Sequence, residues 1–585
     1  MQIKINGMVS EVQAGMTILE AAREMGIDIP TLCYLKGIHE AGACRVCVVE
    51  VKGARTLVPA CITKVTDGME IFTHTARVRR ARRTVVELML SDHPDECLTC
   101  GKNNQCELQK LARAMNIQER KYEGEFSPRL TDDGSPAVIR DSGKCILCRR
   151  CLSVCSQTQG VNAIAPIGRG FKTVIAPAAK EPIIQSPCVQ CGQCINVCPT
   201  GAIMEKSDVA RVWEALEDPR KHVVVQVAPA VRIALGEIFG LEPGTSVTWK
   251  MVSALKKLGF DRVFDTNFSA DLTIMEEGNE LLQRLNEGGK LPMITSCSPG
   301  WINYLEYFFP QLVDHLSTCK SPQQMFGAII KTYYADKTGI PARNIFTVSV
   351  MPCTAKKYES QRPEMNSSGY KDVDAVLTTR ELGVMLKEAG IDLLSCEEET
   401  FDQPFGAGSG AGAIFGNTGG VMEAALRTVY EILTGEELKN LSFHQVRGLT
   451  GVKEASVKIG DRELSVAVVH GLGNIREILD DIDRGKSSYH FIEVMCCPGG
   501  CIGGGGQPVS RDPKVKEKRI AGLYREDEGL PIRKSHENPF IQELYREFLG
   551  RPLGHKSHEL LHTRYRDRRV NGFYWNKDII AAGKR

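Results

Sequence analysis

The sequence predicts a multidomain chain that combines α+β and α/β folds, and three observations lead to this prediction. At 585 residues the chain is long enough for several domains. Fifteen of its 22 cysteines fall within the first 206 residues, in groups with short, regular spacing. After Lys206 cysteines are absent for about ninety residues, and apolar strands such as HVVVQVAPAV, FTVSVMPC and FIEVMCC alternate with helical patterns, as in an α/β domain.

Composition and the start of the chain limit the classes of function. The 73 basic and 71 acidic residues leave a net charge of +2, which gives no overall attraction to nucleic acid or an anionic membrane. The opening MQIKINGMVSEV lacks a signal-peptide pattern, and no apolar run reaches the roughly 18 residues of a membrane span. We therefore expect a cytoplasmic protein with no membrane span and no nucleic-acid partner. Thiols stay reduced there, so the cysteines should be metal ligands or catalytic groups.

Residues 1–76 are predicted to form a β-grasp domain with one [2Fe–2S] cluster. Residues 2–5 and 9–12 alternate in polarity on either side of Asn6-Gly7, which suits a tight hairpin turn. Thr17 and Glu20 form a capping box for the helix that follows. Four thiolates on a loop beside a hairpin suit a [2Fe–2S] cluster, with zinc as the alternative. The ligands are Cys33, Cys44, Cys47 and Cys61.

Residues 77–140 contain one histidine and three cysteines with the spacing of a single metal centre. In HPDECLTCGKNNQC they can surround a [4Fe–4S] cluster, and a Cys3His zinc site is the alternative. Arginines just upstream, in a predicted helix, are expected to form a solvated face. The ligands are His93, Cys97, Cys100 and Cys106, and the arginines are Arg77, Arg79, Arg80, Arg82 and Arg83.

Residues 141–206 carry the most specific pattern, a run C-x2-C-x2-C-x3-C that occurs twice, 43 residues apart. This repeat is typical of bacterial ferredoxins with two [4Fe–4S] clusters, in which the fourth cysteine of each run binds the other cluster. The first cluster should use Cys145, Cys148, Cys151 and Cys198. The second should use Cys188, Cys191, Cys194 and Cys155. Together the N-terminal sites predict four clusters that conduct electrons.

Residues 207–508 should hold the site at which this chain of electron-transfer clusters ends. Here cysteines lie at the ends of predicted strands or in glycine-rich turns, in TSCSPGW, MPCTAKK and VMCCPGGCIGGGG. Loops at the carboxyl ends of strands are where α/β folds build their sites. The residues alone leave Cys297 of TSCSPGW open as a metal ligand, a proton donor or a buried small residue. Cys319 and Cys396 have no such setting and are expected in the core.

These three loops resemble the signature segments of the iron-only, or [FeFe], hydrogenases, and the upstream clusters match the long form of that family over most of the chain. The resemblance is closest to the catalytic subunits of multimeric NAD- or NADP-linked hydrogenases. It implies an H-cluster, in which a [4Fe–4S] cubane is bridged through a cysteine sulfur to a two-iron unit with CO, cyanide and a dithiolate amine. It also implies reversible interconversion of hydrogen with two protons and two electrons.

The resemblance also implies roles for individual residues. Cys353 and Cys497 would bind the cubane, and Cys501 would bridge it to the two-iron unit. Cys297 would exchange protons with the bridging amine. Without the resemblance, the acidic run MEEGNELLQR would be interpreted as a solvated helix face. With it, a proton relay would run from Cys297 through Glu277, Ser317 and Glu280 to Arg284.

Four further positions match the family's surroundings of the H-cluster. Lys356 is similar to the cation that faces an iron-bound cyanide, since a buried ammonium needs an anionic partner. Met351, Gln323 and Met495 occupy matching positions, although Met and Gln more often serve ordinary packing.

The sequence departs from the family pattern at two positions. The family's usual loop is TSCCPxW, and its second cysteine is the cubane's fourth ligand, but this chain has Ser298 there. An alkoxide is harder and less readily deprotonated than a thiolate, so this corner of the cubane should be weakened or altered. Ser298 can bind through oxygen, or Cys297 or Cys496 can replace it; we favour Ser298, with Cys297 as proton donor. Ala230 stands where known members have a serine that can hydrogen-bond a cyanide.

Residues 406–420, GAGSGAGAIFGNTGG, resemble a dinucleotide fingerprint only loosely and follow no convincing strand. We interpret them as close backbone packing near the H-cluster. The chain is then expected to bind neither flavin nor nucleotide.

A tail, residues 509–585, should wrap the catalytic domain. Its main helix is predicted to open at Asn538-Pro539 and to end at Gly550, with one apolar face. Its histidines have no cysteine companions and are expected in surface or structural roles. They are His536, His555, His558 and His562.

The leading prediction is a hydrogenase catalytic subunit with one [2Fe–2S] cluster, three [4Fe–4S] clusters and an H-cluster. Expected partners are a flavoprotein NAD(P)-binding subunit, a small [2Fe–2S] subunit, H-cluster maturation proteins and, in a bifurcating complex, ferredoxin. Two alternatives stay open: an electron-transfer subunit similar to that of NADH dehydrogenase, and a hydrogen sensor. The sequence leaves open the direction of turnover, the choice of NAD or NADP and the oligomeric state.

Overall fold

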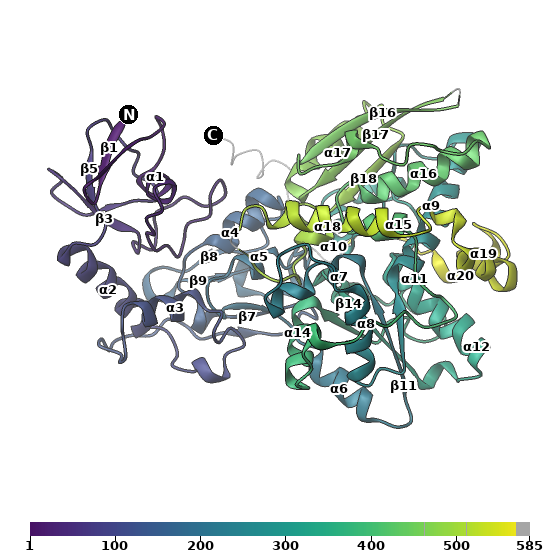
Figure 1. Ribbon diagram of the computed structural model, residues 1–585, viewed down its shortest axis with the longest axis horizontal. Helices are drawn as coiled ribbons and strands as arrows, with labels where there is room; N and C mark the ends of the chain where they lie inside the picture. Colours follow the sequence, from purple (N-terminus) through teal and green to yellow (C-terminus); the bar gives the residue numbers. More distant parts are fainter. Residues whose placement is uncertain (461, 511, 569–585) are drawn as a thin grey trace. The chain divides into compact units, whose positions relative to one another are not determined.

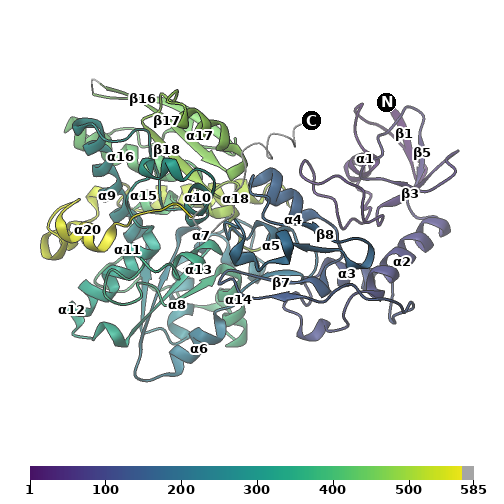
Figure 2. The ribbon, with the colours of Figure 1, turned by 180° about the vertical axis from the view of Figure 1, so that it is seen from behind.

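The computed structural model describes residues 1–460, 462–510 and 512–568. Contacts between residues divide the chain into two compact units. The first contains residues 1–158, 162–186 and 193–204, and the second contains residues 159–161, 187–192 and the chain from 205 onward. Figures 1 and 2 show the elements of each unit from opposite sides.

The N-terminal sheet of the first unit confirms the predicted hairpin. Strands β1 (Gln2–Ile5) and β2 (Met8–Glu11) pair antiparallel across Asn6 and Gly7, whose φ angles are 52° and 90°. Positive φ angles at both turn residues match the right-handed twist of the flanking strands. The sheet order is β2-β1-β5-β3-β4, with β3 (Val48–Val51), β4 (Val58–Pro59) and β5 (Glu70–Phe72).

Helix α1 (Ile18–Glu24) packs its apolar side into the core of this domain. The Thr17 hydroxyl accepts a hydrogen bond from the Glu20 N–H, and the Thr17 N–H donates to the Glu20 carboxylate. The predicted capping box is therefore confirmed. Ile18 and Leu19 are fully buried, in one cluster with the apolar residues of β1.

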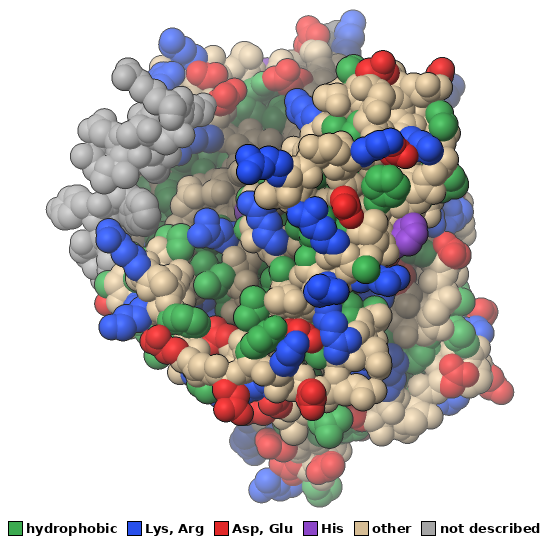
Figure 3. Space-filling model, turned by 90° about the vertical axis from the view of Figure 1, so that its left-hand side faces the viewer, with side chains coloured by type: hydrophobic (Ala, Val, Ile, Leu, Met, Phe, Trp, Pro, Cys, Tyr) green, Lys and Arg blue, Asp and Glu red, His purple; other side chains and the backbone are tan. Residues whose placement is uncertain are grey.

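Helix α2 (Ala76–Ser91) carries the arginine run. Arg77, Arg79, Arg80 and Arg83 are exposed, as predicted. Arg82 is an exception, because its buried guanidinium donates twice to the Val48 carbonyl, at 3.0 and 2.8 Å. Figure 3 shows one face of the molecule, on which Lys and Arg side chains are spread with Asp and Glu among them.

The remaining elements of the first unit are short and carry the cysteine runs. Strands β6 and β7 pair antiparallel, and β8 and β9 form a second antiparallel pair. These elements are α3 (Glu107–Ala114), β6 (Thr131–Asp132), β7 (Val138–Asp141), α4 (Arg150–Ser153), β8 (Ala165–Ile167), β9 (Val174–Ala176), α5 (Gln193–Val197) and β10 (Ile203–Glu205).

The second unit contains a parallel sheet of order β12-β11-β14-β15, as predicted for an α/β domain. Its strands are nearly continuous runs of buried apolar residues, which is typical of a sheet covered on both faces. The strands are β11 (His222–Val227), β12 (Arg262–Asp265), β14 (Ile345–Met351) and β15 (Ala375–Thr378). The helices on this sheet include α6 (Val209–Glu217), α8 (Thr248–Lys257) and α14 (Thr379–Glu388).

A second sheet, of order β13-β18-β17-β16, was not foreseen as a separate sheet. Three of its strands are parallel, and β16 is an antiparallel edge strand paired with β17. The strands are β13 (Met293–Ile294), β16 (Val452–Ile459), β17 (Arg462–His470) and β18 (Phe491–Met495).

The 22-residue helix α9 (Thr266–Glu287) contacts α11 (Pro322–Ile329), α15 (Gly410–Ile414) and α16 (Gly420–Thr434). The glycine-rich segment lies directly on it. A Cβ at Gly408 would come within 2.3 Å of Asn267 Cβ, and one at Gly412 within 2.5 Å of Asn267 O. The interpretation of this segment as close backbone packing is therefore confirmed.

The C-terminal region adds α18 (Val515–Gly529), α19 (Pro539–Leu544) and α20 (His555–Leu561). Asn538 caps α19 as predicted, but the expected single helix changes to a π-helical turn over 545–549 before Gly550. Ile541, Leu544 and Leu549 join the core that contains α11. The last part of the predicted tail, 569–585, lies outside the described residues. Among those described, no helix is both long and apolar enough to span a membrane.

Candidate active site

The four cysteines beside the N-terminal sheet lie together and are all buried. The Cys44 N–H donates to Cys33 Sγ at 3.5 Å, and the sulfurs of Cys47 and Cys61 are 3.3 Å apart. Hydrogen bonds from the partner thiols lower the pKa of Cys44 to about 5 and that of Cys47 to about 7. The same hydrogen bonds raise the pKa of the partner thiols Cys33 and Cys61, so each pair shares one proton, and a bound metal would displace the protons that remain.

The second predicted set, His93, Cys97, Cys100 and Cys106, lines one cavity. His93 Nδ1 lies 3.0 Å from the Pro94 carbonyl, whereas the buried Nε2 has no hydrogen-bond partner among the described residues. Burial lowers the pKa of His93, which keeps the imidazole neutral and able to bind a metal. One nitrogen held by a carbonyl and the other unpartnered is the arrangement of a metal-binding histidine.

Cys145, Cys148, Cys151 and Cys198 line a third cavity. The structure thus brings the last cysteine of the second run to the first three of the first run. The remaining set is divided between the units. Cys155 and Cys194 lie on helical turns that contact each other in the first unit, and Cys188 and Cys191 belong to the second. That ligand set stays a prediction.

In the second unit a pocket lies at the carboxyl ends of strands from both sheets. Cys297 follows β13, Cys353 follows β14, and Cys497 follows β18, with Cys501 on the next turn. All four line the pocket, which encloses about 750 Å³ with its mouth included. Gly504 allows the last loop to close, because a Cβ there would lie 2.1 Å from the Pro352 carbonyl oxygen.

The pocket disfavours thiolates unless positive charge is present. Burial raises the pKa of Cys353 well above its usual range and that of Cys501 to about 12. The charge of Lys356 lowers both values but does not offset burial. A metal centre would supply the missing positive charge, since metal binding and deprotonation of the ligand are coupled.

Ser298 and Cys496 are neighbours in this pocket. The Cys496 N–H donates to Ser298 Oγ at 3.2 Å. The Cys496 thiol lies 3.9 Å from Gln159 Oε1, and hydrogen bonds with Cys191 and Cys497 raise its pKa. Both Ser298 and Cys496 line the pocket, beside Cys353, Cys497 and Cys501.

Lys356, on helix α13 (Ala355–Glu359), is held by a buried network. Its ammonium donates to the Cys297 carbonyl and to Glu359 Oε2, both at 3.1 Å. Gln323 donates to the Lys356 carbonyl and to Glu359 Oε2, both at 3.2 Å, and accepts from Ser349 at 2.7 Å. Gln323, Met351 and Met495 line the pocket as well.

Glu276, Glu277 and Glu280 lie in the interior, so the interpretation of MEEGNELLQR as a solvated face is wrong. Burial, and then the charge of Glu280, raise the pKa of Glu277 to about 8. Neither oxygen of Glu277 has a hydrogen-bond partner among the described residues. The acidic residues are buried because α9 is covered by α11, α16 and the C-terminal segment.

The other relay residues are connected to one another. Ser317 Oγ donates to Glu280 Oε2 at 2.9 Å, and Arg284 Nη2 donates to Glu280 Oε1 at 2.6 Å. Burial, and then the charge of Glu277, raise the pKa of the Cys297 thiol well above its usual range. Cys297 therefore keeps its proton at neutral pH.

Sequence reasoning missed two residues of this site. Glu359 is the carboxylate partner of Lys356, and a Lys-x-x-Glu spacing in a predicted helix could have indicated it. Thr318 donates to Glu280 through its N–H at 3.0 Å and through its hydroxyl at 3.3 Å. Nothing in the sequence distinguishes Thr318 from an ordinary loop residue.

Five thiols, the Ser298 hydroxyl and the Lys356 ammonium line one pocket, and the buried carboxyl of Glu277 has no hydrogen-bond partner among the described residues. This set of groups fits an H-cluster and a proton path. With the ferredoxin-type cysteine sets they define an iron–sulfur redox enzyme. Sequence profiles agree: the iron only hydrogenase large subunit, C-terminal domain, matches residues 221–505, and the iron hydrogenase small subunit matches 513–568. Iron–sulfur profiles match residues 1–76 (2Fe-2S), 82–121 (NADH-ubiquinone oxidoreductase-G type) and 144–202 (4Fe-4S dicluster).

Known proteins give the same result. NADP-reducing hydrogenase subunit HndD of Solidesulfovibrio fructosivorans is 55% identical over 96% of this chain and 98% of its own length. Iron hydrogenase 1 of Clostridium pasteurianum is 42% identical over 96% and 99%. The structure of a variant of [FeFe]-hydrogenase HydA1 from Chlamydomonas reinhardtii matches with a TM-score of 0.56 and 46% identity, covering 62% of this chain and 99% of that one. This chain belongs to the iron-only hydrogenase family and is an [FeFe]-hydrogenase with 2Fe-2S, 4Fe-4S and H-cluster domains. The electron-transfer and sensor alternatives are not favoured.

Proposed function

We propose that this chain is the catalytic subunit of a multisubunit NAD(P)-linked [FeFe]-hydrogenase. HndD, which matches nearly from end to end, is named as a subunit of an NADP-reducing enzyme. The observation that carries the proposal is the convergence of Cys297, Cys353, Cys497 and Cys501 with Lys356 in one pocket.

We further propose the ligand sets given by the sequence. A β-grasp domain over 1–76 would hold one [2Fe–2S] cluster, the 77–140 domain one [4Fe–4S] cluster, and the 141–206 domain two. In the 207–508 domain Cys353, Cys497, Cys501 and Ser298 would hold the H-cluster, with the 509–585 tail around it. Ser298 is preferred to Cys496 as fourth ligand because it stands at the position of the family's second loop cysteine and lines the pocket.

The H-cluster, when bound, supplies the interconversion of hydrogen with two protons and two electrons. The protein's part is to hold a proton at Cys297 Sγ and to exclude water from the pocket. Lys356, kept charged and oriented by Glu359, would face the anionic ligands of the cluster. Gln323, Met351 and Met495 would complete the wall around them.

The proton would leave or reach Cys297 through Glu277, whose pKa of about 8 lets it donate and accept near neutral pH. Ser317 would pass the proton to Glu280, which Arg284 holds in place. Electrons would pass through the four N-terminal clusters to a flavoprotein NAD(P)-binding subunit that docks at the first unit. A small [2Fe–2S] subunit, ferredoxin and maturation proteins would be the other partners.

The test is infrared spectroscopy and iron analysis of the matured protein. We expect bands of iron-bound CO and cyanide, and a Cys297→Ala variant that keeps these bands but loses about 100-fold or more in hydrogen turnover. Iron sufficient only for the N-terminal clusters, without such bands, would refute the H-cluster assignment. Undiminished turnover in Cys297→Ala would refute the role of that thiol.

A further inference from the structure

The residue at the outer end of the proposed relay is a poor point of proton exchange. Arg284 is a guanidinium, which stays protonated at every physiological pH and so cannot accept a proton from Glu280. Its side chain is only 13% exposed. It donates to the carbonyls of Lys290, Asp314, His315 and Leu316 at 2.7 to 3.4 Å, and to Glu280. Arg284 therefore positions Glu280, and protons need another way to the solvent.

A second chain of hydrogen bonds begins at Glu280. The Thr318 hydroxyl lies 3.3 Å from Glu280 Oε2 and 2.8 Å from His562 Nδ1. A hydroxyl can donate to one of these groups while it accepts from the other. Thr318 thus connects the buried carboxylate of the relay to an imidazole.

His562 is fixed in this position by its backbone. Cys319 and His562 form an antiparallel bridge, in which the Lys320 N–H donates to Leu561 O and the Thr563 N–H donates to Thr318 O, both at 2.8 Å. The C-terminal segment is therefore joined to the relay loop by main-chain hydrogen bonds. The hydrogen bonds of the ring itself, to Thr318 at Nδ1 and to Glu276 at Nε2, hold Nδ1 toward Thr318.

The groups around His562 come from four segments. Helix α9 contributes Glu280 and Glu276, whose Oε2 lies 3.1 Å from His562 Nε2. Glu276 also accepts from the Tyr545 hydroxyl at 2.5 Å and from the Leu553 N–H at 2.8 Å. Cys319 lies next to the ring on the paired loop. From its own helix α20, His558 contacts His562 with ring centroids 4.4 Å apart.

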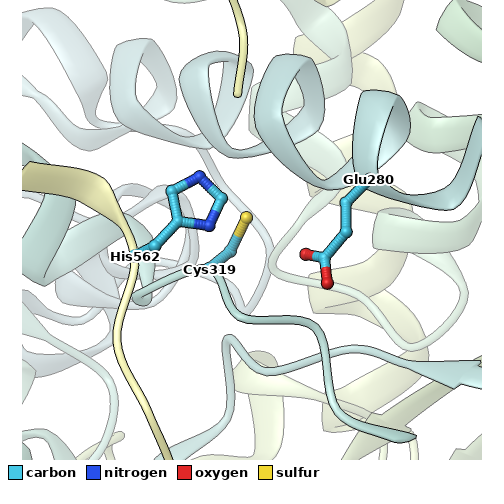
Figure 4. A group of neighbouring side chains, drawn as sticks. All are labelled: Glu280, Cys319 and His562. Atoms are coloured by element: carbon cyan, nitrogen blue, oxygen red, sulfur yellow. The ribbon is translucent and has the colours of Figure 1, made fainter. Parts of the chain in front are cut away.

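Figure 4 shows the side chains of Glu280, Cys319 and His562 grouped together. One possible ligand atom from each lies within 4.8 Å of the others. This spacing would suit a metal ion. However, both nitrogens of His562 and both oxygens of Glu280 already have hydrogen-bond partners. Burial also raises the pKa of the Cys319 thiol well above its usual range, which disfavours a thiolate ligand. The group is better suited to moving protons than to binding a metal.

His558 provides the opening to solvent. Its side chain is exposed, whereas that of His562 is buried. The two rings are in contact, and His562 Nε2 faces the Glu276 carboxylate at 3.1 Å. His558 is therefore the exposed imidazole beside the buried pair of His562 and Glu276. An imidazole is the side chain best suited to exchange protons with water near neutral pH.

We propose that the proton relay branches at Glu280 and reaches solvent through Thr318, His562 and His558. This inference rests on the proposed relay through Glu277 and Glu280. Inward transfer begins when a proton from protonated His558 passes through the Glu276 carboxylate to His562 Nε2, the nitrogen that this carboxylate faces. His562 Nδ1–H then donates to Thr318 Oγ1 as the Thr318 proton moves to Glu280 Oε2, which leaves Thr318 neutral. Outward transfer reverses each step, and Glu276 stabilises the transient imidazolium at Nε2.

The experiment compares variants of the matured enzyme in a dye-linked hydrogen assay in H2O and D2O. His562→Gln keeps polar atoms but cannot carry a proton, and His558→Ala removes the exposed ring. We expect each to lower turnover by about threefold to tenfold and to raise the solvent isotope effect, with unchanged CO and cyanide bands. Added imidazole should restore His558→Ala, because that side chain lies at the surface, whereas equal ionic strength from NaCl should not.

Two further variants separate the branch from the relay and from folding. His555→Gln, at an exposed histidine of the same helix outside the network, should behave as wild type. Thr318→Val breaks the same branch one step earlier and replaces His562→Gln if that variant does not mature. Wild-type turnover and isotope effect in these branch variants, with activity lost in Glu280→Gln, would refute the branch alone. Wild-type activity in Glu280→Gln would refute the relay and the branch with it.

Discussion

At the scale of single residues, the buried carboxyl of Glu277 lowers the stability of the fold but has a pKa suited to proton transfer. A carboxyl with an ordinary pKa of 4.5 is held where burial raises the value to about 8. Below pH 4.5 it is protonated in the folded and the unfolded chain alike. Above that pH the unfolded carboxyl ionises while the folded one stays neutral, so the folded state loses stability as pH rises toward 8. In the proposed relay this carboxyl can both donate and accept a proton, because its pKa lies near neutral pH.

We predict that Glu277→Gln stabilises the protein and disables it. At pH 8 the free energy of unfolding should rise by about 1–3 kcal/mol, and the gain should shrink toward pH 5.5. Hydrogen turnover should fall by about 100-fold or more. Thermal unfolding at both pH values and a dye-linked assay measure the two effects. Glu287→Gln, at an exposed position of the same helix, is the control and should change neither quantity.

At the scale of secondary structure, local signals predicted most elements, and tertiary contacts decided the rest. The Asn6-Gly7 hairpin and the Thr17 capping box follow from turn and cap chemistry, which acts over a few residues. The charge pattern of α9 wrongly predicted a solvent-exposed helix face, because the groups that cover this helix come from elsewhere in the chain. The backbone pairing of Cys319 with His562 could not be predicted either, since a local sequence pattern does not indicate a partner more than 200 residues away.

The contact between α15 and α9 gives a prediction for one element. Gly412→Ala places a Cβ 2.5 Å from the Asn267 carbonyl oxygen, and backbone atoms cannot move aside cheaply. We expect a loss of about 1–3 kcal/mol in the free energy of unfolding, measured by thermal or denaturant unfolding. Gly529→Ala is the matched control, because a Cβ at that exposed helical glycine would have no neighbouring atom within 4 Å. It should be neutral or stabilising by up to about 1 kcal/mol.

At the scale of the whole molecule, cysteine spacing carried most of the functional prediction. Cys198 lies with Cys145, Cys148 and Cys151 because ferredoxin spacing encodes the exchange of ligands between runs. The H-cluster pocket could not be derived that way. Its thiols come from loops after strands of two different sheets, and only the resemblance of their sequences to known loops joined them. Spacing specifies a site when the ligands are close in sequence, and the fold specifies it when they are not.

In the proposed function the N-terminal domains transfer electrons and the H-cluster pocket carries out the hydrogen reaction. This separation leads to a prediction for the entire chain. Cys44→Ala removes a proposed ligand of the [2Fe–2S] cluster, the site furthest along the chain from the catalytic pocket. With the flavoprotein partner, NAD(P)-linked hydrogen turnover should fall at least about tenfold, because that electron route is interrupted. Dye-linked turnover should stay within about twofold of wild type, since the pocket and its relay are untouched. Cys396→Ser, a buried cysteine outside every proposed ligand set, should keep both activities. Equal loss of both activities in Cys44→Ala would show that the N-terminal cluster supports the fold of the subunit and does not serve as the entry point for electrons.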